Sequence, residues 1–243
     1  MPMSLARRIS RAMTILREEG PLALGHSLAE AVRQGLGRPS RERLAYLAQK
    51  AAVDERFDSA NGVDTGGVQH LYGLTIEGEN AAFGVNHIAT DPHDFAHAIE
   101  QLDIAPESAA FVDLGAGKAR ALIMAGAYPF RAIVGVEFAR ELHQAGLDNL
   151  AKAAPHLREP ARISMVLGDA AQYELPEGPV VLYLFNPFGG PVIEQVARRT
   201  TLAAKDRPLR LIYMNPVHGD IWTALGWTKL ADERAYAIFT PPA

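Results

Sequence analysis

The chain has 243 residues, a mass of 26.3 kDa, 48% hydrophobic and 21% charged residues and a net charge of −4, which is typical of a folded globular protein and excludes a disordered chain. The absence of cysteine excludes disulfides, thiolate metal sites and cysteine nucleophiles. Apolar runs are too short for a membrane span and the N-terminus lacks the apolar core of a signal peptide, so we expect a cytoplasmic protein.

The N-terminal part of the sequence is basic, whereas the remainder is acidic. Residues 1–50 hold nine Lys and Arg against four Glu, a net charge of +5, which leaves −9 for residues 51–243. Apolar side chains at helical spacing predict one amphipathic helix through Leu5, Ile9, Met13 and Leu16, and a second helix is predicted around 26–35. We define residues 1–56 as a basic helical extension and expect its apolar stripe to pack on the body. Contact with an anionic partner or with a membrane surface is the alternative.

Residues 57–104 are predicted to form a cap or linker segment. The sequence RFDSANGVDTGG at 56–67 is dense in Asp, Asn and Gly, which favours a loop. The sequence FGVNHIATDP at 83–92 is also rich in polar and turn-forming residues. Both stretches contain more polar groups than a simple linker requires.

From residue 105 onward, apolar runs alternate with helical patterns. The runs predicted to be strands are AAFVDL (109–114), AIVGVEF (132–138), ISMVLGDA (163–170), VVLYLFNPF (180–188) and LRLIYMNP (209–216). Helical sequences such as 139–154 and 191–204 separate them, which predicts a parallel sheet covered on both faces. Two strand-like runs at 226–233 and 235–242 have no helix between them and predict a terminal antiparallel hairpin.

Ligands of an open parallel sheet bind beyond the carboxyl ends of its strands, so the candidate site residues are sought there. The first predicted strand ends in DLGAG (113–117), which combines a carboxylate with a glycine turn. The second ends in Glu137, the third in GDA (168–170), the fourth in NPFGG (186–190) and the fifth in NP (215–216). Polar or turn-forming residues therefore lie at all five strand ends. No pairing of histidines with carboxylates in the sequence predicts a metal site.

Three ligands compete for the glycine turn. A nucleoside-triphosphate loop is excluded, because Lys118 is followed by Ala119 where that motif has Ser or Thr. A dinucleotide turn requires a small residue where this chain has Arg120. S-adenosylmethionine has no pyrophosphate and presents an amine, a sulfonium, a ribose diol and an adenine. Carboxylates at the ends of the first three strands suit those groups, among them Asp113 and Glu137.

Four short motifs, in this order, resemble those of class I S-adenosylmethionine-dependent methyltransferases. They are FVDLGAGKAR (111–120), VGVEFA (134–139), GDA (168–170) and LFNPF (184–188). The resemblance covers residues 105–243 and implies a Rossmann-like, doubly wound, mostly parallel seven-stranded sheet with a C-terminal antiparallel hairpin. Within that superfamily the chain most resembles bacterial relatives of the non-SET protein lysine methyltransferases. It departs from their first motif at Ala116 and Ala119, where serine and glycine are usual.

The resemblance implies a set of cofactor-binding residues. It implies that Glu137 accepts the ribose hydroxyls, that Asp113 orients the turn and the cofactor's amino group, and that Asp169 meets the adenine edge. The expected S-adenosylmethionine site consists of Asp64, Thr65, Asp113, Gly115, Ala116, Gly117, Glu137, Asp169, Ala170 and Asn186. Asp64 and Thr65 enter this set because they precede the sheet where the fold places a cap, at the methionine end of the cofactor.

The resemblance also implies the reaction. Asn186, Pro187 and Phe188 resemble the strand-four end of amino-group methyltransferases, without their second proline and their tyrosine, so they are the candidate catalytic residues. We expect methyl transfer to a nitrogen of a protein or small molecule, and we do not expect a nucleic-acid acceptor. An NAD(P)-dependent oxidoreductase and a non-catalytic S-adenosylmethionine-binding regulatory protein are the alternatives.

Overall fold

The computed structural model describes residues 41–69, 74–76, 80, 83–85 and 87–242. The two helices predicted within residues 5–35, and the question of what their apolar stripe contacts, lie outside the described residues. From Ala51 onward the chain forms one compact unit. None of the helices in the described ranges has the length and apolar content that a membrane crossing requires.

The first described helix is α3, Arg41–Asn61. Its C-terminal turns occupy residues 56–61, for which the sequence predicted a loop, and that prediction is wrong. The helix continues because the carboxylates of Asp54 and Asp58 have partners elsewhere in the fold, described below. It ends where Gly62 takes a positive φ of 67°, the left-handed conformation that commonly stops helices.

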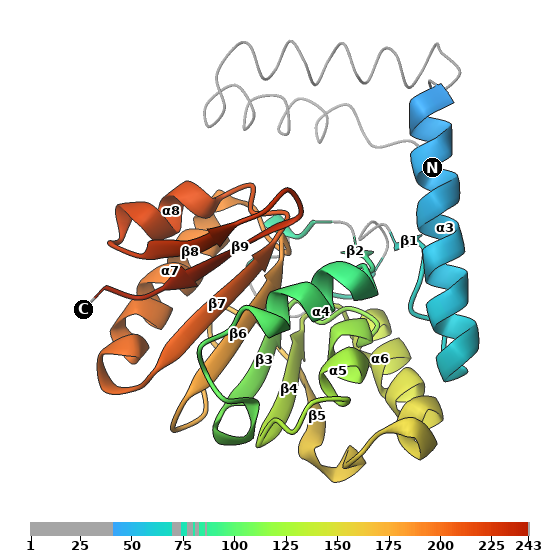
Figure 1. The fold of residues 1–243 in the computed structure, drawn as a ribbon, viewed down its shortest axis with the longest axis horizontal. Helices are drawn as coiled ribbons and strands as arrows, with labels where there is room; N and C mark the ends of the chain where they lie inside the picture. The colour runs from blue at the N-terminus through green and yellow to red at the C-terminus, as the bar shows by residue number, and fades with distance from the viewer. Residues whose placement is uncertain (1–40, 70–73, 77–79, 81–82, 86, 243) are drawn as a thin grey trace. The chain divides into compact units, whose positions relative to one another are not determined.

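The sheet has the predicted form. Its seven strands are β3 Ala110–Leu114, β4 Ala132–Glu137, β5 Ile163–Leu167, β6 Val180–Phe185, β7 Leu209–Met214, β8 Thr228–Asp232 and β9 Tyr236–Thr240. They lie in the order β5-β4-β3-β6-β7-β9-β8. β3 to β7 are parallel to one another, and β9 runs antiparallel to both β7 and β8 (Figure 1). This is the Rossmann-like, doubly wound architecture with a terminal hairpin that the sequence predicts.

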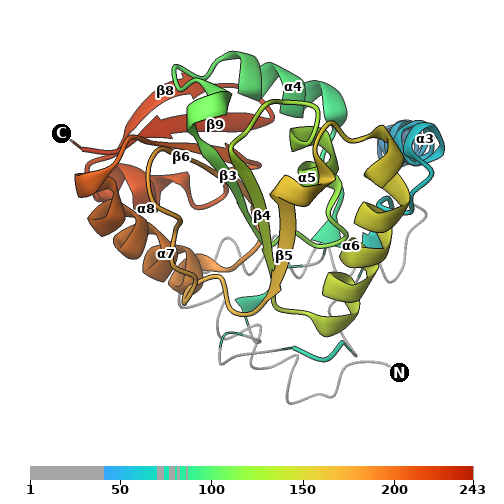
Figure 2. The same ribbon diagram turned by 90° about the horizontal axis from the view of Figure 1, so that it is seen from below.

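Helices cover both faces of the sheet, as Figure 2 shows. One face carries α4 Pro92–Glu100, α5 Arg120–Ala125 and α6 Arg140–Ala153, and the other carries α7 Gly190–Ala203 and α8 Gly219–Ala224. The two faces bury separate apolar clusters, because β3 and β6 are apolar on both sides. The α4 helix begins at a cap in which the Asp91 carboxylate accepts the His93 N–H, followed by Pro92 in the first turn.

The order of the strands reverses at β3. From β3 the chain goes first to β4 and β5 on one side and then returns to β6 on the other. The connections that follow β3 and β6 therefore leave the sheet in opposite directions. In sheets of this kind, ligands bind at the carboxyl ends of the strands where the order reverses, here the ends of β3, β4 and β6.

One parallel crossover differs from the others. In the described chain, β5 and β6 are joined by residues 168–179 without an α-helix, whereas α5, α6 and α7 follow β3, β4 and β6. The sheet face beside β5 consequently lacks a helical cover, and Val166 on β5 is 38% exposed. This feature leaves space between α7 and the connecting loop.

The segment before the sheet crosses the carboxyl ends of the strands. Its short strands β1, Val68–Gln69, and β2, His87–Ile88, pair antiparallel. Isolated bridges join Ile76 to Ala139 and Gly84 to Phe188. The predicted cap and linker segment is thus hydrogen-bonded to the sheet domain at two strand ends.

Arg120, the first residue of α5, joins α3 to the glycine turn. Its guanidinium is 2% exposed and donates to Asp54 Oδ1 (2.5 Å) and Asp58 Oδ1 (3.1 Å). It also donates to Thr65 Oγ1 (2.6 Å) and to the Thr90 carbonyl (3.2 Å). A buried cation with two carboxylates and two further acceptors is well satisfied, and removing one partner would leave buried charge uncompensated.

We expect Arg120→Leu to lower the free energy of unfolding by about 3–5 kcal/mol, because Asp54 and Asp58 would lose the cation that compensates their burial. Urea unfolding measures the loss. Arg198→Leu is the matched control, since the Arg198–Glu194 pair on α7 is exposed and worth at most about 1 kcal/mol. Equal effects of the two substitutions would contradict the structural role given to Arg120.

Candidate functional site

The glycine turn follows β3 directly. The N–H groups of Gly115 and Ala116 donate to the Val136 carbonyl on β4 at 2.8 and 3.0 Å. Gly115 and Gly117 have φ values of 95° and 53°, which side chains with a Cβ rarely adopt. A Cβ at Gly115 would also clash with Pro187, and one at Gly117 with the His87 ring. Both glycines are therefore required by conformation and by close approach.

Glu137 ends β4 beside this turn. Its Oε2 accepts the Gly117 N–H at 2.7 Å and its Oε1 accepts the Ala139 N–H at 2.8 Å. The side chain is buried, and this burial raises its pKa, while the N–H groups of Ala139, Gly117 and Phe138 oppose the rise. The carboxylate thus fixes the turn and has lone pairs left for a ligand.

Asp113 lies on β3, opposite Gly135 of β4 and Tyr183 of β6. The side chain is 3% exposed, and the described residues give its carboxylate no hydrogen-bond donor. Burial raises its pKa well above the ordinary value, and the charge of Glu137 raises it further. The neighbouring Tyr183 hydroxyl is hydrogen-bonded to Thr90 Oγ1 at 2.7 Å. A buried carboxylate without a donor is costly, and a ligand that supplied donors would relieve that cost.

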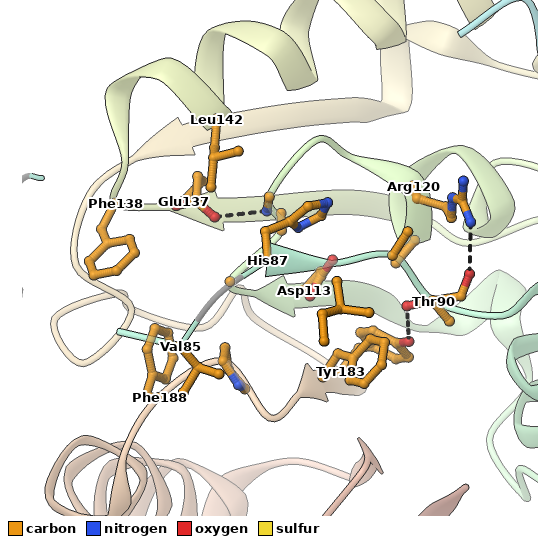
Figure 3. A pocket seen from close by; sticks show the side chains of 18 residues that line it. Val85, His87, Thr90, Asp113, Arg120, Glu137, Phe138, Leu142, Tyr183 and Phe188 are labelled. Atoms are coloured by element: carbon orange, nitrogen blue, oxygen red, sulfur yellow. Dashed lines mark hydrogen bonds between the residues drawn. The ribbon is translucent and has the colours of Figure 1, made fainter. Parts of the chain in front are cut away.

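A cavity of about 50 Å³ lies over these groups. Figure 3 shows that its walls include His87, Asp113, Glu137, Phe138 and Phe188. We call residues 83–85 and 87–90 the cover segment, and its residues 85 and 87–90 line one side of the cavity. The volume holds one or two waters. A ligand of nucleoside size would extend beyond this volume.

The structure brings together seven of the predicted site residues. The predicted residues that line the cavity are Asp113, Gly115, Ala116, Gly117, Glu137, Pro187 and Phe188. They come from the ends of β3, β4 and β6, as the parallel sheet requires. The Pro187 carbonyl accepts the Val85 N–H at 3.2 Å, and the Gly189 N–H donates to the Phe83 carbonyl at 2.7 Å, so the cover segment is bonded to the end of β6.

Asp64 and Thr65 do not line the cavity. The Asp64 carboxylate is largely exposed and lies 3.3 Å from Lys118 Nζ. The Thr65 side chain is fully buried, and its hydroxyl donates to Asp58 Oδ1 at 2.6 Å. Asn149 on α6 holds their loop, because it accepts the Asp64 N–H and donates to the Asp64 carbonyl, both at 2.9 Å.

Asp169, Ala170 and Asn186 also lie outside the cavity wall. Asp169 accepts from Asn80 Nδ2 at 2.7 Å and from the Ala171 N–H at 2.9 Å. Ala170 lines a separate cavity on the other face of the sheet. Asn186 has a positive φ of 39°, and its Oδ1 accepts from the Tyr213 hydroxyl at 3.4 Å.

Thr90, Tyr183 and His87 also line the cavity, and the candidate site predicted from the sequence did not include them. Tyr183 had a usable signal in the sequence. It lies two residues before Phe185, at the end of the same strand, so the two side chains point to the same face, and both line the cavity. Thr90 had none, because its contact with Tyr183 joins residues 93 positions apart. The His87 ring packs on Gly117, where a Cβ would collide with it.

The raised pKa of Asp113 predicts a pH dependence of stability. In the unfolded chain its pKa is about 3.9, so between that value and the higher folded pKa the folded state binds more protons. The stability due to Asp113 is therefore complete below about pH 4 and is lost as the pH rises through the folded pKa. We expect Asp113→Asn to gain stability relative to the unmodified protein as the pH rises, in urea unfolding from pH 4 to pH 8.

Asp103→Asn serves as the control with the opposite sign. A hydrogen bond from Arg210 lowers the pKa of Asp103, so its contribution is present above the unfolded pKa and is lost only as the pH falls below about 4. The stability difference of Asp103→Asn should therefore stay nearly constant from about pH 4 to pH 8 and change only at lower pH. A stability difference for Asp113→Asn that is constant from pH 4 to pH 8 would contradict the raised pKa.

No protein-family model and no curated protein matches the chain. Similar solved structures include an RNA methyltransferase from Salinibacter ruber in complex with S-adenosyl-L-homocysteine, with 18% identity over 64% of this chain and 94% of that one, TM-score 0.47. A putative S-adenosyl-L-methionine-dependent methyltransferase from Methanococcus maripaludis has 14% identity over 63% and 85%, TM-score 0.45. A precorrin-6y C5,15-methyltransferase from Geobacter metallireducens has 16% identity over 64% and 90%, TM-score 0.46. Similarities this weak carry no argument about function. The fold of this chain is established by its own strand order.

Proposed function

We propose that this protein is a methyltransferase that uses S-adenosylmethionine. The observation that carries the proposal is the pair of buried carboxylates, Asp113 and Glu137, at adjacent strand ends around the glycine turn. Two carboxylates in one buried cavity repel each other and require donors. A ligand with a cationic amine and a ribose diol supplies such donors, and S-adenosylmethionine has both.

The contacts of the turn favour this ligand over a dinucleotide. A pyrophosphate is held by free backbone N–H groups at such a turn. Here the N–H groups of Gly115 and Ala116 are bonded to Val136, and that of Gly117 is bonded to Glu137. A pyrophosphate would therefore meet two carboxylates without these three donors, which is electrostatically unfavourable.

The residues divide into roles in this proposal. Asp113 would accept from the cofactor's amino group and Glu137 from the ribose diol, and both bonds are charge-assisted. Asp169 stays our candidate for the adenine amino group, although it would have to share its carboxylate with Asn80. When bound, S-adenosylmethionine would supply an electrophilic methyl group. The buried walls would exclude water and hold the acceptor in line, which is the main requirement of methyl transfer.

The end of β6 is the proposed acceptor site. Pro187 offers a main-chain oxygen and Phe188 an apolar surface at the cavity. Asn186 lies outside the cavity wall, and its side-chain oxygen would have to be shared with the Tyr213 hydroxyl to bind a nitrogen acceptor. The Pro187 carbonyl already accepts the Val85 N–H, so an acceptor would use its second lone pair or displace the cover segment.

The acceptor is proposed only as a nitrogen compound. The similar structures are named as methyltransferases of RNA and of precorrin-6y, so they support no particular class of acceptor. Our expectation that the acceptor is not a nucleic acid gains no support from them. The finer resemblance to relatives of the non-SET lysine methyltransferases stays a prediction.

The proposal is tested by binding and by turnover. Calorimetry with S-adenosylmethionine and with NAD(H) and NADP(H) separates methyltransferase from oxidoreductase, and binding of the dinucleotide alone would refute the proposal. Incubation with methyl-labelled cofactor and separate protein, nucleic-acid and small-molecule fractions then identifies the acceptor. Binding without label transfer to any fraction would favour the regulatory protein instead.

Glu137→Gln should weaken S-adenosylmethionine binding at least tenfold. The substitution keeps the shape but removes the charge from bonds worth about 1.5–3 kcal/mol each, and about 1.4 kcal/mol is tenfold in Kd. Calorimetry measures the change, and Glu194→Gln on the exposed side of α7 is the matched control. An unchanged Kd in a folded Glu137→Gln protein would remove this residue from the cofactor site.

A further inference from the structure

A second cavity lies on the face of the sheet that α7 covers, beside the helix-free crossover. Its volume is about 250 Å³, larger than that of the first cavity. Successive residues of a strand point to opposite faces, so Asp113 of β3 lines the first cavity and Leu114 lines the second. The two cavities are therefore separated by the sheet, and the inference below does not depend on the proposed function.

Part of the lining of the second cavity is apolar. Leu114 and Val196 are buried members of the apolar cluster on this face, and Tyr173 and Leu175 of the crossover pack against the same cluster. A purely inorganic anion would leave these side chains in contact with water. The lining instead suits a ligand with an apolar body.

The polar part of the lining is positively charged. Arg199 and Arg207 face one carboxylate, that of Glu174, and neither guanidinium has an ion pair within the described ranges. Arg199 donates to the Gln172 carbonyl at 3.4 Å, and Arg207 donates through Nη1 to the carbonyls of the crossover. Each guanidinium has further N–H groups, and the Nε of Arg207 is buried without a partner in the described structure.

Thr200 adds a polar side chain to the lining of the cavity. This α7 residue is only 4% exposed and lines the cavity. Its hydroxyl has no hydrogen bond within the described chain, whereas the hydroxyl of the next residue, Thr201, donates to the Ala197 carbonyl at 2.7 Å. The Thr200 hydroxyl can therefore donate or accept a hydrogen bond inside the cavity.

We propose that the second cavity binds a small organic carboxylate. Its carboxylate would pair with the guanidinium groups of Arg199 and Arg207 and accept from the Thr200 hydroxyl. Its apolar body would lie against Leu114 and Val196. Charge-assisted bonds to arginine give such a site its preference for anions over neutral molecules of the same shape.

Octanoate is the probe, and octanol is the uncharged probe of the same chain length. Calorimetry on the full chain should detect saturable octanoate binding, with octanol at least tenfold weaker. Arg199→Gln should weaken octanoate at least fivefold, because it removes one guanidinium. Arg198→Gln, one residue away on the exposed face of α7, is the matched control and should leave octanoate binding unchanged.

Ala203→Phe tests the location, because the added ring would fill the cavity at the end of α7 and should abolish octanoate binding. Circular dichroism checks that the variant is folded, and Ala203→Leu replaces it if it is not. Three results would overturn the proposal: no binding at about 10 mM octanoate, well above the Kd expected for a weak small ligand; equal affinity for octanol; or unchanged octanoate binding in the folded Ala203 variant.

Discussion

The buried guanidinium of Arg120 is the interaction on which the geometry of the first cavity depends. A cation at the first residue of a helix is poorly placed, because the N–H groups there already give that end a partial positive charge. Asp54 and Asp58, one turn apart on α3, offset this cost by supplying two carboxylates. The same carboxylates accept N–H groups of the loop at 65–67, so one cluster fixes α3, that loop and the start of α5 together. The glycine turn is thereby held in place from the side opposite the sheet.

The sheet could be predicted because its determinants are local. β3 and β6 are apolar on both faces, and the hairpin follows from two strand patterns without an intervening helix. The groups at the strand ends could be predicted for the same reason, since Asp113, Gly117 and Glu137 are positioned by the strands that carry or adjoin them.

Several contacts before the sheet depend on partners that are distant in the sequence. Asp58 lies in a stretch whose composition favours a loop, yet it sits on α3 and bonds to a side chain 62 positions away. Asp64 and Thr65 were assigned to a ligand from their position before the sheet. In the structure Thr65 serves the Arg120 cluster, and Asp64 is held by Lys118 and Asn149. Such long-range pairings carry no periodic signal in the chain, so composition alone could not reveal them.

The order of strands in the sheet has a consequence for how the chain folds during its synthesis. β3 is a central strand, but its second neighbour, β6, begins roughly 65 residues after β3 ends. At translation rates of about 5–20 residues per second, the apolar edge of β3 therefore waits several seconds for its partner. Parallel pairings of this kind are slow to form because a long loop must close first. Until β6 is synthesised, one edge of β3 has no partner strand, and an unpaired apolar edge is the kind of surface that favours aggregation.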